Sequence, residues 1–171
     1  MKLSTGIFYF AALIGLVAAI PAMAQQRRLV EGGCRQGSCW ETYYLGKRLI
    51  HNNTLGGNSN RLFEVDLEVV SDYSGTNPRK QWVYCSLEES FVAFDFPDED
   101  DEFLYFHYLS PANTLNIGGY NQGSLSLYWA VCHDRFDESI YDLAATALQL
   151  GYFESQSSYQ TILPKSFLRI F

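Results

Sequence analysis

Basic residues are scarce in this sequence. Its 171 residues include 12 Lys and Arg against 19 Asp and Glu, so the formal net charge is −7 at pH 7. Phosphate backbones and anionic lipid surfaces attract positively charged proteins and repel acidic ones. The charge balance therefore argues against nucleic acid, and against an anionic membrane surface, as a partner.

The sequence also lacks a second long apolar run. Apart from residues 6–20, no stretch approaches the roughly 18 apolar residues that a membrane-spanning helix needs. Lys2 precedes this run, and Pro21–Ala24 ends it with an A-x-A pattern before Gln25. That order is typical of a secretory signal peptide. We therefore expect residues 1–24 to be a signal peptide cleaved after Ala24, a secreted or periplasmic protein, and no transmembrane segment in the mature chain.

Cysteine occurs four times, as Cys34, Cys39, Cys85 and Cys132. In an oxidising compartment these residues should pair, and three pairings are possible. We favour Cys34–Cys39, which closes a short loop that Gly37 can turn, and Cys85–Cys132, which would tie two predicted strands across the core. The two alternatives, which link each early cysteine to a late one, stay open. A zinc site needs two close pairs of ligands, and Cys85 and Cys132 are each isolated, so we expect no metal.

Recognisable catalytic motifs are absent as well. His51, His107 and His133 form no H-x-x-x-H pair, and the chain has no G-x-S-x-G elbow. Cys132, His133 and Asp134 resemble a catalytic grouping. However, neighbours on a predicted strand point to opposite faces, and a disulfide would remove the thiolate. We therefore expect no catalytic residue and no cofactor.

The acidic run Asp98–Glu102 lacks the central glycine and the distant glutamate of an EF-hand calcium loop. We interpret this run as the solvated tip of a hairpin. Whether the tip binds calcium stays open.

Aromatic residues are abundant by contrast, with 12 Phe, 12 Tyr and 3 Trp, which is typical of β-rich packing. Residues 61–70 alternate apolar and acidic side chains, which predicts a strand with one buried face. Further strands are predicted at 40–45 and 48–51, joined by a turn at Gly46-Lys47, and at 81–87, 91–96, 103–109 and 125–132. An edge strand is predicted within 161–171.

One helix is predicted near residues 137–150. Its apolar residues recur at helical spacing: Ile140, Leu143, Ala144, Ala147 and Leu148. Acidic residues suit its start, and Gly151 suits its end. We predict a flexible leader at residues 25–33, followed by a single β-rich domain at 34–171. Its class is α+β, with a mainly antiparallel sheet, one amphipathic helix and stabilising disulfides.

A possible binding face is predicted from aromatic residues near loops. Exposed aromatic rings can stack on a sugar or on a peptide. The candidates are Trp40, Tyr43, Tyr44, Tyr120 and Asn121.

A series of motifs spans most of the mature chain. It consists of C-x4-C-W at 34–40, W-V-Y-C-S at 82–86, H-Y-L-S-P at 107–111, G-Y-N at 119–121 and Y-W-A-V-C-H at 128–133. In this series the chain resembles uncharacterised secreted four-cysteine proteins of cyanobacteria and some other bacteria. The resemblance implies a bacterial source and argues against glycosylation at the Asn52 sequon. It implies no activity.

We predict a non-enzymatic protein that binds a protein or glycan ligand of the envelope or exterior, or that stabilises the envelope. The alternative is a secreted hydrolase with an unrecognised active site. An enzyme should show a deep pocket with converging titratable groups, whereas a binding protein should show a shallow aromatic or charged face.

Overall fold

The computed structural model describes residues 27–170 except for 56–57, 96–101, 114–120 and 155–156. The expected signal peptide, most of the acidic run and Tyr120 lie outside the described residues. No helix among the described residues is long and apolar enough to cross a membrane.

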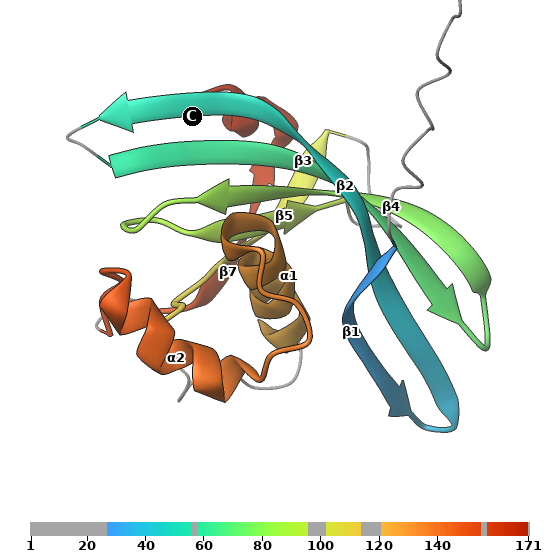
Figure 1. The fold of residues 1–171 in the computed structure, drawn as a ribbon. Coiled ribbons are helices and arrows are strands. Elements are labelled where there is room, and N and C mark those ends of the chain that lie inside the picture. The colour runs from blue at the N-terminus through green and yellow to red at the C-terminus, as the bar shows by residue number, and fades with distance from the viewer. Residues whose placement is uncertain (1–26, 56–57, 96–101, 114–120, 155–156, 171) are drawn as a thin grey trace, which may run out of the picture.

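A seven-stranded sheet forms the framework, and each strand pairs antiparallel with the next in chain order. Two helices, α1 and α2, lie between β6 and β7 in the sequence and pack on one face of the curved sheet (Figure 1). The α+β class, the mainly antiparallel sheet and the disulfide stabilisation are therefore confirmed. The strands are β1 (Arg28–Arg35), β2 (Ser38–Leu55), β3 (Asn58–Ser71), β4 (Gly75–Cys85), β5 (Phe91–Phe94), β6 (Phe103–Tyr108) and β7 (Tyr159–Pro164).

The predicted flexible leader is wrong from Arg28 onward, because this segment forms β1. Gln36 and Gly37 both have positive φ, 51° and 83°, which is the conformation of a tight hairpin turn. The turn sets Cys34 opposite Cys39, and these two residues form a disulfide. Strand pairing and this bridge hold a segment whose polar composition suggested mobility.

The predicted turn at Gly46-Lys47 is also wrong. Strand β2 runs through it, and the pairing with β3 shifts register between Tyr44 and Gly46 and again between Leu49 and His51. Such bulges bend a strand and increase its twist. The glycine therefore marks a bend that curves the sheet around the helices.

The predicted strand at 125–132 is a helix, α1 (Asn121–His133). Leu125 and residues 127–131 are all buried, so the segment has little polar face to reveal a helical period. Helix α1 lies against the concave face of the sheet, and the Cys85–Cys132 disulfide ties it to the end of β4. Both favoured pairings are thus confirmed, although the second joins a strand to a helix.

The predicted helix near 137–150 is confirmed as α2 (Ile140–Gln149). The Ser139 side chain caps its start, and Gly151, with a φ of 94°, follows its end. Leu143 and Ala147 are buried as expected, but Leu148 is 46% exposed, so the apolar stripe is narrower than predicted.

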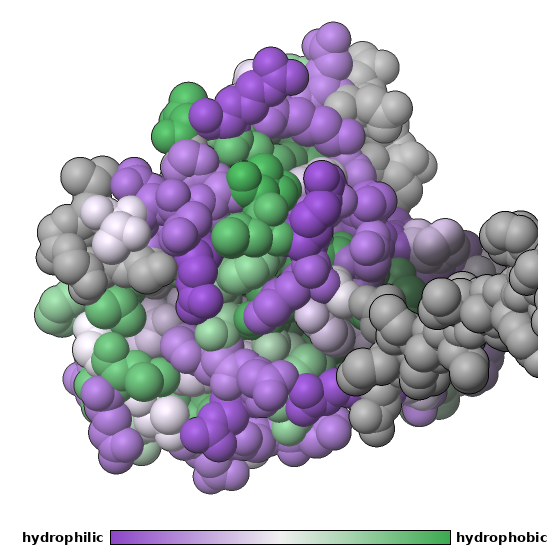
Figure 2. Space-filling view, turned by 45° about the horizontal axis from the view of Figure 1, so that its top comes forward, coloured by the Kyte–Doolittle hydropathy of each residue, from purple (hydrophilic) through white to green (hydrophobic). Residues whose placement is uncertain are grey.

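Two apolar clusters lie on opposite faces of the sheet. The concave-face cluster includes Val65 and Leu67 of β3 and Trp129 of α1. The outer-face cluster, built around Phe91 and Phe106, is covered by the 3-10 helix η1 (Lys165–Arg169). The predicted edge strand at the C-terminus is therefore β7 followed by this cover. On the face shown in Figure 2, hydrophilic residues dominate, with apolar side chains between them.

Candidate functional site

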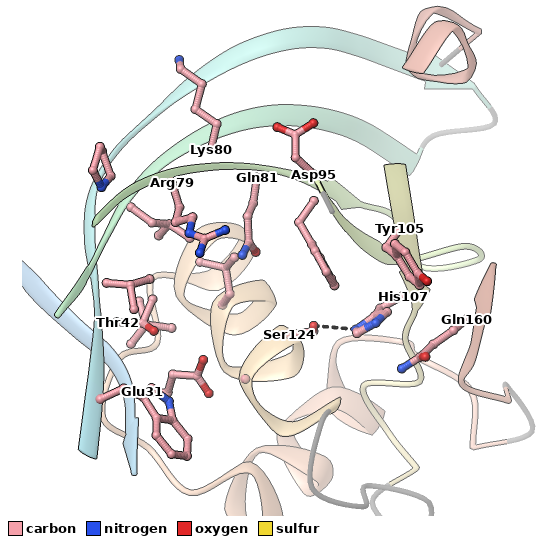
Figure 3. Close-up of a pocket in the computed structure, with 18 residues that line it drawn as sticks. Glu31, Thr42, Arg79, Lys80, Gln81, Asp95, Tyr105, His107, Ser124 and Gln160 are labelled. Atoms are coloured by element: carbon pink, nitrogen blue, oxygen red, sulfur yellow. Dashed lines mark hydrogen bonds between the residues drawn. The ribbon is translucent and has the colours of Figure 1, made fainter. Parts of the chain in front are cut away.

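A cavity of about 690 Å³ lies between the concave face of the sheet and the first turn of α1 (Figure 3). Strand alternation decides which side chains reach it. Arg79 and Gln81 of β4 point into it, whereas Lys80 between them points away and contacts Glu64 and Asp66 on the outer face, at 2.9 and 3.2 Å. Residues from β1, β2, β4, β6 and α1 thus share one cavity.

Glu31 of β1 directs its carboxylate to the start of α1. A Cβ atom on Gly123 would lie 2.1 Å from Oε2 of Glu31, so only glycine leaves room for this carboxylate. Burial raises the pKa of the Glu31 carboxyl, and a hydrogen bond with the Thr42 side chain partly opposes the rise. Among the described residues, no Lys or Arg forms an ion pair with Glu31.

Trp40 of β2 forms the adjacent wall of the cavity. Its indole ring lies over Gly33 of β1, where an added Cβ would be 3.0 Å from the ring. Gly33 and Glu31 are two residues apart on one strand and share a face. The glycine therefore lets the ring approach β1 closely, on the face that carries the carboxylate.

The predicted binding face is not one surface. Of its three β2 aromatics, Trp40 lines the cavity, while Tyr44 packs against Phe136 with ring centroids 5.5 Å apart. Tyr43 lies on the other side of the strand, beneath the Arg27 guanidinium at 3.6 Å. Asn121 is the first residue of α1, and Tyr120 is outside the described residues.

A serine and a histidine meet at the opposite side of the cavity. Nδ1 of His107 on β6 lies 2.9 Å from Oγ of Ser124 on α1 (Figure 3). Burial lowers the pKa of His107, so the ring is neutral at pH 7. A neutral imidazole beside a hydroxyl is the pairing of a base with a nucleophile. Within the described segments no carboxylate bonds to His107 to orient the ring.

Cys132, His133 and Asp134 do not act as one group, because each contacts a different residue. Cys132 is bonded to Cys85, Nε2 of His133 lies 2.8 Å from the Tyr152 hydroxyl, and Asp134 pairs with Arg28 at 2.7 Å. The strand argument used against a catalytic unit was wrong, because Cys132 and His133 lie on a helix. Over the described ranges, no three His, Cys, Asp or Glu residues converge as a metal site would require.

Sequence reasoning missed Glu31, Arg79 and the His107–Ser124 pair, although it had noted His107 as a histidine. One available signal was Glu31-Gly32-Gly33, since glycine within a strand often marks a close approach of another group. The other residues belong to segments far apart in the chain, and only the meander of strands brings them together.

No protein-family model matches the chain, and no curated protein or solved structure matches it.

Proposed function

We propose that this protein is a secreted or periplasmic, non-enzymatic binding protein. Its ligand is a small molecule, or an exposed group of an envelope glycan or protein, held in the cavity between the sheet and α1. The observation that carries the proposal is the wall of the cavity, which combines aromatic and apolar side chains with a few converging polar groups. This composition is typical of ligand pockets, whose volumes run from about 300 to 1,000 Å³.

The frame around the cavity supports the same proposal. Cys85–Cys132 ties β4 to α1, and both elements supply lining residues. A site that is rigid before binding loses less conformational entropy when the ligand enters. The two disulfides and the expected signal peptide favour an oxidising compartment outside the cytoplasm.

Native mass spectrometry tests the binding proposal. Protein comprising residues 25–171 is incubated with envelope extract and separated from unbound material, and the mass of the intact complex is then measured. A bound species should appear on the wild type. Gln81→Trp should abolish it by filling the cavity, whereas the control Asp66→Trp, at an exposed position on the outer face, should retain it. Equal retention by both variants, or no bound species on the wild type, would contradict the proposal.

A secreted hydrolase is the second candidate function, and the 2.9 Å contact between His107 and Ser124 is the observation that favours it. A fluorophosphonate probe and a set of simple esters test this candidate. A hydrolase would be labelled at Ser124 and would lose both labelling and turnover in Ser124→Ala but not in Ser126→Ala. A binding protein would show neither label nor turnover.

A further inference from the structure

We propose that the cavity recognises an alkylammonium group of its ligand, in the corner formed by Glu31, Trp40 and Gly123. This inference deepens the proposed binding function and rests on it. The corner lies where β1 and β2 meet the first turn of α1 (Figure 3).

The Glu31 carboxylate has no countercharge among the described residues. Glu31 is half-buried, its hydrogen bond comes from the neutral Thr42 side chain, and among described residues it has no ion-pair partner. Other partly buried acids do have one, such as Glu64, which contacts both Arg48 and Lys80. A carboxylate removed from water without a countercharge gains when a ligand supplies the charge.

The Trp40 ring differs from several other aromatic rings of the protein, because no cation of the described residues lies over it. A Lys or Arg side chain lies over the rings of Tyr43, Phe63, Trp82 and Phe136. Within the described parts of the chain, none lies over Trp40, the one described tryptophan that lines the cavity. Tryptophan is the aromatic residue that attracts cations most strongly. A carboxylate and an open indole face together form a site for an ammonium group.

Two glycines leave room for the Glu31 carboxylate and the Trp40 ring. A Cβ on Gly123 would displace the Glu31 carboxylate, and a Cβ on Gly33 would press on the Trp40 ring. A larger residue at Gly123 would therefore move the carboxylate, and one at Gly33 would require the Trp40 ring to shift. Gly123 within a helix also costs stability relative to alanine, so its presence there fits a role in the site.

Arg79 limits the charge of the ligand. It points into the cavity from β4, is exposed, and pairs with no described acid. Its guanidinium would repel a second cationic group, so the ligand carries a single ammonium or is a zwitterion whose anionic group reaches Arg79. Arg79 itself is solvated, whereas Glu31 is half-buried, so the ammonium end dominates recognition.

Isothermal titration calorimetry on protein comprising residues 25–171 tests the inference. The probes are ethanolamine, choline and the neutral carbon analogue of choline, in which a tert-butyl group replaces the trimethylammonium group. At least one of the cations should bind at least tenfold more tightly than the neutral analogue. Glu31→Gln should reduce that affinity at least tenfold, and Trp40→Leu should also weaken it. Glu41→Gln, on the exposed side of the same hairpin, is the control and should leave it unchanged.

The source of the ammonium group is assigned with vesicles of phosphatidylcholine. Flotation of the wild type but not of Glu31→Gln would assign a lipid headgroup, and binding of soluble probes alone would assign a soluble ligand. Equal affinity for choline and its neutral analogue, no binding of either cation, or full affinity in Glu31→Gln would overturn the inference. In those cases a bound species that Gln81→Trp abolishes would still support the binding function, so the two proposals fail separately.

Discussion

At the scale of single residues, the most specific prediction concerns Gly123. Gly123→Ala adds a methyl group where the Glu31 carboxylate lies, 2.1 Å from its Oε2. The carboxylate is the far end of a flexible side chain and can rotate away, while alanine favours the helix. We expect stability to stay within about 1 kcal/mol of the wild type, with loss of the affinity that depends on Glu31.

Chemical unfolding and calorimetry on one preparation check the Gly123 prediction. Gln122→Ala, one residue earlier and exposed, is the control. In a Glu31→Gln background, Gly123→Ala should lower affinity no further, because the two changes remove the same charge from the corner. An unchanged affinity in Gly123→Ala alone would show that the carboxylate does not need its present position.

A second prediction for a single residue concerns His133 and the pH dependence of folding stability. Burial and the nearby charges of Arg61, Arg135 and Lys47 lower its pKa from 6.5 to about 4. The unfolded chain therefore binds a proton between these values that the folded protein does not. Stability should rise with pH through this window and be lost as pH falls from 6.5 toward about 4.

The comparison variant for His133 is His133→Gln, whose amide can still bond to the Tyr152 hydroxyl. Other groups titrate nearby in pH, including His107, whose pKa is lowered, and Glu31, whose pKa is raised. The difference in unfolding free energy between wild type and variant isolates the contribution of His133 titration. Urea unfolding from pH 4 to pH 7 should show the wild type losing stability relative to the variant as pH falls, and parallel curves would contradict the assignment.

Individual residues also show which parts of the site could be predicted from the sequence. Trp40 was identified as an aromatic residue that could stack on a sugar or a peptide. Glu31 was not, because an isolated acid in a polar segment resembles a solvated one. Its half-burial depends on Thr42 and Gly123, which are distant in the chain and become neighbours only after β1 pairs with β2 and α1 packs on the sheet.

At the scale of elements, the two helices differ in what their sequences reveal. Helix α2 packs one side on the core and exposes the other, so its apolar residues recur with helical spacing. Helix α1 is buried on most sides and contains Val, Tyr and Trp, which favour strands, so its composition indicated a strand. Packing in the concave sheet overrides that local preference.

The packing of α2 is tested by Leu143→Asp. Leu143 is 2% exposed and faces the concave-face cluster, so the change buries an unpaired carboxylate. We expect a loss of roughly 3 kcal/mol or more, or failure to fold. Gln149→Asp, at an exposed position of the same helix, is the control and should cost little. Equal melting temperatures for the two variants would show that this face of α2 is not buried.

At the scale of the whole molecule, the two disulfides constrain chain segments of very different length. Cys34–Cys39 spans 5 residues of sequence separation, and Cys85–Cys132 spans 47. A bridge stabilises mainly by restricting the unfolded chain, and the effect grows with the logarithm of the loop. The longer bridge also crosses from the sheet to α1 and so fixes two walls of the cavity.

Double cysteine-to-serine variants separate these contributions. Removing Cys34–Cys39 should cost about 2 kcal/mol and removing Cys85–Cys132 about 4 kcal/mol, as chain entropy predicts for these loops. The short bridge closes a hairpin whose positive-φ turn already brings its ends together, whereas no local turn does so for Cys85 and Cys132. Urea unfolding of both variants measures the two losses of unfolding free energy.

Only the variant without Cys85–Cys132 should also lose ligand affinity before it unfolds, because α1 and β4 can then move apart. An equal or reversed order of stability would show that the hairpin, and not the tie between sheet and helix, holds the fold together.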